Sequence, residues 1–185
     1  DLVATMVVAG EYDALRYGSL HDARYDSAGR RLATGSADGV VRIWCTESQQ
    51  LLAQLASHQA PVLVVGWAPK KLLPVQLVSG AADGSVALWR EEHGVWKAIH
   101  HFSVRGSVVA ASFRPAEYGL MLAVASSESP DICFLTRKEV VASSVLPSGE
   151  QWVSKPMAAH SSGLVALSWG PSASPATLAA GPAAA

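Results

Sequence analysis

Two stretches of the chain carry a hydroxyl and a carboxylate at spacings that could do chemistry, and a His precedes each stretch. The first, ATGSADGVVRIW, ends at Trp44, and the second, VSGAADGSVALW, ends at Trp89. A Ser or Thr activated by His and Asp is the nucleophile of many hydrolases. The same groups, joined to an indole N–H, can instead satisfy one another in a buried network, because each would cost free energy if left unpaired.

The repetition of this set favours structure over catalysis. The two sets are His21, Thr34, Asp38 and Trp44, and His58, Ser79, Asp83 and Trp89. In both, the Asp lies four residues after the hydroxyl and the Trp six residues after the Asp. An enzyme needs one such site, and the sequence has no signal for an oxyanion hole. We therefore predict a structural role for both sets, with no catalytic residue, no metal and no cofactor.

The composition is that of a globular, soluble domain. The chain has 185 residues, of which 50% are hydrophobic, enough for one domain with a sizeable core. Its formal net charge of −1 produces no field that would attract nucleic acid. The cysteines, Cys45 and Cys133, are too few for a disulfide framework, which favours a reducing compartment. The N-terminus does not begin with Met and lacks the basic region of a signal peptide.

The elements that must position these residues are short strands. Alternating apolar segments bounded by Gly, Pro, Ser and Asp recur along the chain, whereas helical periodicity is hard to find. An aromatic residue stands two positions before a Pro at Trp67, Phe113 and Trp169. These aromatic residues lie 46 and then 56 residues apart, and a repeat of about that length is typical of a four-stranded propeller blade. The predicted fold class is all-β, a partial β-propeller of about three and a half blades.

We expect a single partial propeller domain over residues 1–185. Its repeats run approximately over 19–57, 58–102, 103–159 and 160–185, the last incomplete, after an N-terminal strand at about 3–10. Repeats are stabilised by their neighbours, so half a propeller should not persist alone. The sequence therefore predicts either a piece of a longer chain or a remainder without fixed structure.

The third repeat departs from the pattern. Val104 stands where His is expected, Glu128 lies near the position of the turn Asp, and Leu135 ends the strand in place of Trp. We expect this blade to lack the network. The substitutions are typical of the degeneracy of such repeats, and adaptation to a partner is the other explanation.

Three stretches resemble the Sec-thirteen family of WD-repeat β-propellers. They are HDARYDSAGRRLATGSADGVVRIW, WREEHGVWKAIHH and RPAEYGLMLAVASSE. The resemblance extends from Leu20 to Pro171 and is most specific in the first two repeats. In WD-repeat proteins, the four residues of each set form a hydrogen-bonded chain from Trp through the hydroxyl and His to Asp, and the resemblance implies that role here.

The resemblance also implies a scaffold. Propellers of this family have six blades in an open ring, and an α-solenoid partner closes the ring by donating a blade in trans. That partner is a rod subunit of the COPII vesicle cage or a nucleoporin of the nuclear pore Y-complex. The implied locations are the cytoplasmic face of ER exit sites and COPII vesicles, and the nuclear pore at the nuclear envelope. Contact with the membrane would be indirect, through the coat, and no direct contact with nucleic acid is expected.

The receiving edge is expected near the first blade. An unclosed ring leaves unpaired N–H and C=O groups, which invite an added strand. We place this edge at the N-terminal strand, with the residues Ala4, Thr5, Met6, Val7, Val8 and Ala9.

Three other interpretations remain open. A WD-repeat recognition module would bind short peptides at the narrow face of the central channel. A related nuclear-pore propeller shares the first-blade stretch and the run GLMLA, although the string WREE followed by Gly and Trp favours the Sec-thirteen family. A hydrolase would use His21 and Asp38.

Overall fold

Strands account for nearly all the regular structure of the residues that the structure describes. The computed structural model describes residues 18–69, 77–139, 150–170 and 178–182. Within these residues the only helix is a short 3-10 turn, η2 (Ala116–Tyr118), so the predicted all-β class is confirmed. No helix in the described ranges has the length and apolar character needed to cross a membrane.

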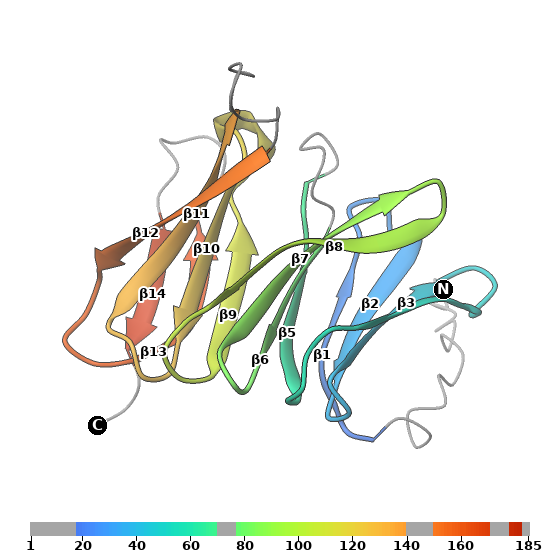
Figure 1. The fold of residues 1–185 in the computed structure, drawn as a ribbon, viewed down its shortest axis with the longest axis horizontal. Coiled ribbons are helices and arrows are strands. Elements are labelled where there is room, and N and C mark those ends of the chain that lie inside the picture. Colours follow the sequence, from blue (N-terminus) through green and yellow to red (C-terminus); the bar gives the residue numbers. More distant parts are fainter. Residues whose placement is uncertain (1–17, 70–76, 140–149, 171–177, 183–185) are drawn as a thin grey trace, which may run out of the picture.

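The strands form three antiparallel sheets of four strands and one of two, each paired in chain order (Figure 1). We call them blades one to four. Blade one holds β1 (Leu20–Tyr25), β2 (Arg31–Ser36), β3 (Val40–Cys45) and β4 (Leu51–Ala56), and blade two holds β5 (Val62–Trp67), β6 (Leu77–Ala81), β7 (Ser85–Glu92) and β8 (Val95–Ser103). Blade three holds β9 (Val108–Phe113), β10 (Met121–Ser126), β11 (Asp131–Glu139) and β12 (Glu150–Ala158), and blade four holds β13 (Leu164–Trp169) and β14 (Leu178–Pro182).

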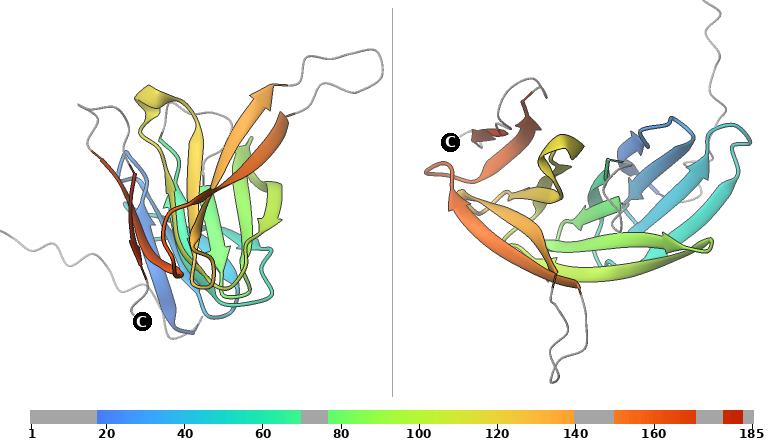
Figure 2. Two further views of the ribbon diagram at one scale, coloured as in Figure 1. Left: turned by 90° about the vertical axis from the view of Figure 1, so that its left-hand side faces the viewer. Right: turned by 90° about the horizontal axis from the view of Figure 1, so that it is seen from above.

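The sheets are arranged as the blades of a propeller. The first strand of each blade is innermost, since β5 packs beside β1 and β9, and β9 packs beside β13. Seen from above, the blades fan out from these strands, and β4, β8 and β12 lie at the outside (Figure 2). Blade one stands at one end of the fan and blade four at the other. The predicted open, partial propeller is therefore confirmed.

All four blades are built in the same register. The pairing of the first and second strands skips one residue at the same place in each blade, namely His21, Leu63, Val109 and Val165. Such a bulge bends a strand and increases its twist. Because it recurs, equivalent positions can be read from the pairing: Thr34 of β2 corresponds to Ser79 of β6 and to Val124 of β10.

The apolar cores lie between the blades. Side chains of a strand alternate between the two faces of its sheet, so each blade has a face toward each neighbour. Between blades one and two, Val41 and Ile43 of β3 are fully buried against Val62 and Val65 of β5. Two further clusters fill the spaces between blades two and three and between blades three and four. The blades are therefore held together by the burial of their faces.

Polar contacts also tie neighbouring blades. The indole N–H of Trp67 donates to the backbone carbonyl of Arg24 in the preceding blade at 2.8 Å, and that of Trp169 donates to the carbonyl of Ser112 at 3.1 Å. These indoles are the aromatic residues that precede Pro in the sequence. Phe113 holds the equivalent place in blade three, and its ring has no N–H to donate. There the rings of Trp152 and His100 stack across the boundary, with centroids 6.1 Å apart.

The Asp-Gly turns fit against the loop that precedes the next blade. Gly39 and Gly84 have φ of +78° and +83°. A Cβ on Gly39 would lie 2.8 Å from the carbonyl oxygen of His58, and one on Gly84 would lie 2.2 Å from that of Val104. Positive φ and close approach both require glycine here. The turn of blade one therefore packs against the backbone that carries His58.

We expect Gly84→Ala to lower the free energy of unfolding by more than Gly94→Ala does. Gly94 also has a positive φ, +80°, but a Cβ there would meet nothing within 4 Å. The control therefore isolates the conformational cost, about 1–2 kcal/mol, from the clash with the loop. Urea unfolding, followed by circular dichroism, measures the free energy of unfolding of both variants. Equal losses of that free energy would contradict a role for the close approach.

Candidate functional site

A chain of hydrogen bonds runs through blade two. The indole N–H of Trp89 donates to the Ser79 hydroxyl oxygen at 2.8 Å. The His58 Nε2 atom lies 2.7 Å from the same oxygen, and His58 Nδ1 lies 2.7 Å from the Ser85 hydroxyl oxygen. Ser85 in turn bonds to Asp83 through its side chain, and its backbone N–H donates to the carboxylate at 2.9 Å.

The order of donors and acceptors fixes the protons of this chain. Because the Ser79 oxygen accepts the indole N–H, its own hydrogen is available for His58 Nε2. The proton of the neutral ring then resides on Nδ1, and this N–H donates a hydrogen bond to the Ser85 hydroxyl oxygen. The Ser85 hydroxyl in turn donates to the Asp83 carboxylate. Burial lowers the pKa of His58, which favours this neutral form. The hydrogen bonds from Ser85 lower the pKa of Asp83, which therefore stays ionised.

The second predicted set is thus brought together around Ser85, a residue that the sequence reasoning missed. Ser85 stands between His58 and Asp83, which were expected to bond directly. Its position after the Asp-Gly pair was the available signal, because blade one has Val40 there and no hydroxyl.

The prediction for His21 is wrong. His58 lies four residues before β5, whereas His21 lies inside β1, at the bulge, with its side chain exposed. The position equivalent to His58 in blade one is Arg16, which is outside the described residues. His21 precedes the hydroxyl residue in the sequence as His58 does, but the segment that contains it, Leu20–Tyr25, forms the first strand itself and not the loop before it. The structure therefore does not bring His21 to Asp38, as a hydrolase would require.

An arginine takes over the polar contacts of blade one. Arg42 is buried, only 4% exposed, and its guanidinium donates to the Asp38 carboxylate at 2.5 Å and to the Ser36 hydroxyl at 2.8 Å. The bond from Arg42 lowers the pKa of Asp38 to about 2, assisted by bonds from Ser36 and from the backbone of Val40. The predicted Trp44 contact is present, since its indole N–H donates to Thr34 Oγ1 at 3.0 Å.

Blades three and four differ from blade two in opposite ways. In blade three the positions of the His, the hydroxyl and the Trp hold Val104, Val124 and Leu135, and all three belong to the apolar packing between blades two and three. Blade four keeps the imidazole: His160 lies four residues before β13 and its Nε2 is 2.9 Å from the carbonyl oxygen of Ala180. Ala180 occupies the place of the hydroxyl residue.

Blade one has one face that no described blade covers. In β5 the side chains of Val62 and Val65 are 0% and 1% exposed, because they face blade one. The equivalent residues of β1 are Leu20, which is 43% exposed, and Ala23, which is also exposed. We call this surface the open face of blade one. It carries Trp44, which is half-buried, whereas Trp89 is 4% exposed.

The edge predicted for a partner lies outside the described residues. This applies to the whole N-terminal strand that was expected at about 3–10. In the described part of the chain, no cluster of three His, Cys, Asp or Glu side chains has the arrangement needed to hold a metal ion.

We expect His58→Ala to lower the free energy of unfolding by about 1–3 kcal/mol, because it leaves the Ser79 and Ser85 hydroxyls without their ring partner. The exposed His21 provides the matched control, and His21→Ala should stay within about 0.5 kcal/mol of the parent chain. Thermal and urea unfolding measure both variants. A loss at His21 as large as at His58 would refute this assignment.

We also expect Asp38→Asn to lower stability at neutral pH and to have less effect in acid. The pKa of Asp38 is depressed from 3.8 to about 2 in the folded state, so ionised Asp38 stabilises the fold above pH 3.8 and that contribution is lost as pH falls toward 2. Unfolding curves of the parent and the variant should therefore converge between these values. A difference that stays constant from pH 6 to pH 2.5 would contradict the ion pair with Arg42.

The sequence is similar to known WD-repeat proteins. The WD domain, G-beta repeat family model matches residues 17–45 and 49–90. Protein transport protein sec13 of Emericella nidulans is 34% identical over 171 residues, which is 86% of this chain and 52% of that protein. The SEC13 homolog of Drosophila melanogaster is 34% identical over 169 residues, 89% of this chain and 45% of that protein. The chain thus spans about half the length of the curated relatives it matches.

A solved structure supports the fold. The β-propeller domain of Myceliophteria thermophila Cps50 (Swd1) superimposes with a TM-score of 0.56 at 22% identity, over 74% of this chain and 39% of that domain's chain. At that identity the likeness concerns the propeller architecture alone. The repeats and the strand arrangement show that the chain is a WD-repeat β-propeller, and its sequence is similar to Sec-thirteen proteins over most of its length.

Proposed function

We propose that this chain is a non-enzymatic scaffold subunit that binds an α-solenoid protein and stiffens it within a membrane-curving assembly. The partner would be a rod subunit of the COPII vesicle cage or a nucleoporin of the nuclear pore Y-complex. The name of its relatives, protein transport protein, supports a role in protein transport. The corresponding sites are ER exit sites and COPII vesicles, with the nuclear pore as the second location.

The open face of blade one is the observation that carries this proposal. Elsewhere in the described fold, the same face of a blade is covered by its neighbour, and Val62 and Val65 are buried there. On blade one that face exposes Leu20 and Ala23 and keeps a Trp44–Thr34 contact like that of blade two. A surface already built for packing against a sheet is the surface that a donated blade would cover.

The covering group is expected to be a β-sheet with small and apolar side chains. The face that covers blade two is formed by Ala33, Val41, Ile43 and Leu55 of blade one. A partner blade with residues of similar size would reproduce this packing on the open face. Backbone pairing at the strand edges would add directional contacts, as in strand addition.

A photo-crosslinking residue placed at position 20 tests this proposal. Leu20 lies on the open face, and the matched control is Val95, which is 57% exposed on the outer strand of blade two. The full chain is expressed in cells, irradiated, purified under denaturing conditions and analysed by mass spectrometry. We expect adducts to a cage rod subunit or a Y-complex nucleoporin from position 20 and not from position 95.

Two results would contradict the proposal. One is an equal yield of those adducts at both positions, since binding would then not involve the open face. The other is an absence of both solenoid proteins from the adducts, in extracts where they are detected and the variant remains folded.

A further inference from the structure

The last residue of the innermost strand holds an equivalent place in all four blades. Trp67, Phe113 and Trp169 end β5, β9 and β13, and each is paired with a Leu of the neighbouring second strand. Tyr25 ends β1 and is paired with Leu32 in the same way. Tyr25 is therefore the counterpart in blade one of the aromatic residues that precede Pro in the other blades.

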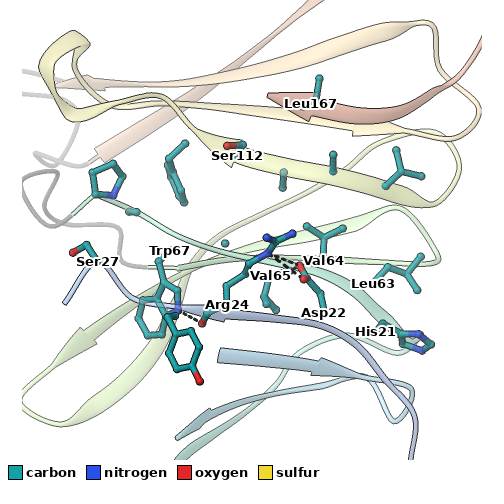
Figure 3. Close-up of a pocket in the computed structure, with 18 residues that line it drawn as sticks. His21, Asp22, Arg24, Ser27, Leu63, Val64, Val65, Trp67, Ser112 and Leu167 are labelled. Atoms are coloured by element: carbon teal, nitrogen blue, oxygen red, sulfur yellow. Dashed lines mark hydrogen bonds and ion pairs between the residues drawn. The ribbon is translucent and has the colours of Figure 1, made fainter. Parts of the chain in front are cut away.

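In two blades this residue makes a hydrogen bond to the preceding blade. The indole N–H of Trp67 donates to the carbonyl oxygen of Arg24 at 2.8 Å (Figure 3), and that of Trp169 donates to the carbonyl oxygen of Ser112 at 3.1 Å. In each case the accepting residue comes directly before the aromatic position of its own strand. The same contact thus joins the ends of neighbouring innermost strands at two separate boundaries.

The position of the innermost strand explains why a carbonyl group is available there. Each innermost strand lies at one edge of its sheet and borders the cavity of about 720 Å³ that these strands enclose. Backbone groups on that edge have no strand to pair with. A polar group left without a partner costs free energy on burial, so a donor from the next blade stabilises it. A blade therefore offers a backbone carbonyl to the aromatic residue of the blade that it covers.

Tyr25 has the donor for this contact and no described acceptor. Its side chain is 56% exposed, and no residue in the described ranges accepts a hydrogen bond from its hydroxyl. Tyr25 follows Ala23 by two positions in the strand, so both lie on the open face of blade one. Asp22 fixes this strand, because its carboxylate accepts the backbone N–H of Val65 in β5 at 3.1 Å and is only 16% exposed.

We propose that the Tyr25 hydroxyl donates a hydrogen bond to a backbone carbonyl at the end of the partner's innermost strand. This role rests on the proposed function, because the partner would cover the same open face. Leu20 and Ala23 provide apolar contacts there, and Tyr25 adds a directional one that sets how far the covering sheet extends along β1. A helix would not serve in the same way, because all but its last carbonyls are already bonded within the helix.

The test measures how tightly the full chain binds its partner with and without this hydroxyl. The purified cage rod subunit and the purified Y-complex nucleoporin of the same organism are each titrated, and the one that binds the parent chain is used for the variants. We expect Tyr25→Phe to raise the dissociation constant about fivefold, which corresponds to the loss of one neutral hydrogen bond. Equal dissociation constants for the parent and this variant would overturn the proposal.

Two further variants separate the hydrogen bond from other effects. Tyr118→Phe makes the same change on blade three and should leave the dissociation constant unchanged. Tyr25→Trp supplies the indole N–H found at this place in blades two and four, and should bind more tightly than Tyr25→Phe. Urea unfolding of the chain alone should give the same midpoint for Tyr25→Phe as for the parent. Equal weakening by Tyr25→Trp and Tyr25→Phe would overturn the proposal.

The photo-crosslinking residue at position 20 distinguishes a failure of this role from a failure of the proposed function. Solenoid adducts from position 20, together with a dissociation constant that Tyr25→Phe leaves unchanged, would overturn the role of Tyr25 and keep the scaffold. A parent chain that gives no adduct with either solenoid and binds neither would contradict the scaffold and the role of Tyr25 together.

Discussion

Each blade of this molecule is stable only because its neighbour covers it. A four-stranded sheet has two faces, and in blade two both are apolar and lie in clusters shared with blades one and three. The clusters contain residues of the strands on both sides of each boundary, so none of them belongs to one repeat alone. It follows that the first and last described blades each have a face that no other described blade covers. The open face of blade one, the proposed partner contact and the marginal stability expected of a few repeats all derive from this constraint.

The hydrogen-bonded networks obey the same constraint, because they lie where the faces are buried. A buried polar group without a partner costs free energy, so each blade must provide partners for the polar groups that it keeps. Blade two retains it and adds Ser85, and blade three replaces it with Val104, Val124 and Leu135. Blade one is intermediate: Arg42 provides donors to Asp38 and Ser36, while Trp44 still donates to Thr34.

The fold was predictable because the residues that indicate it lie close together in the sequence. The errors concern residues whose partners come from a separate part of the chain. Hydroxyl, Asp and Trp lie on one hairpin, so their spacing is fixed by strand pairing and reads directly from the sequence. The His comes from a separate loop, and only the repeated bulge at positions such as His21 and Leu63 reveals which residue is equivalent to His58. Arg42 was not predictable as a substitute donor, because its role depends on side-chain direction.

The geometry of β1 explains how one short strand contributes to two different surfaces. Successive side chains of a strand point to opposite sides, so Asp22 and Arg24 share one side while Ala23 lies on the other. The first side faces the cavity and the backbone of β5, and the second belongs to the open face. The side chains on the first side are therefore different from those that a covering sheet would meet. Because both sets belong to one short strand, displacement of β1 would alter both surfaces, and an innermost strand fixed by Asp22 to the next blade resists that displacement.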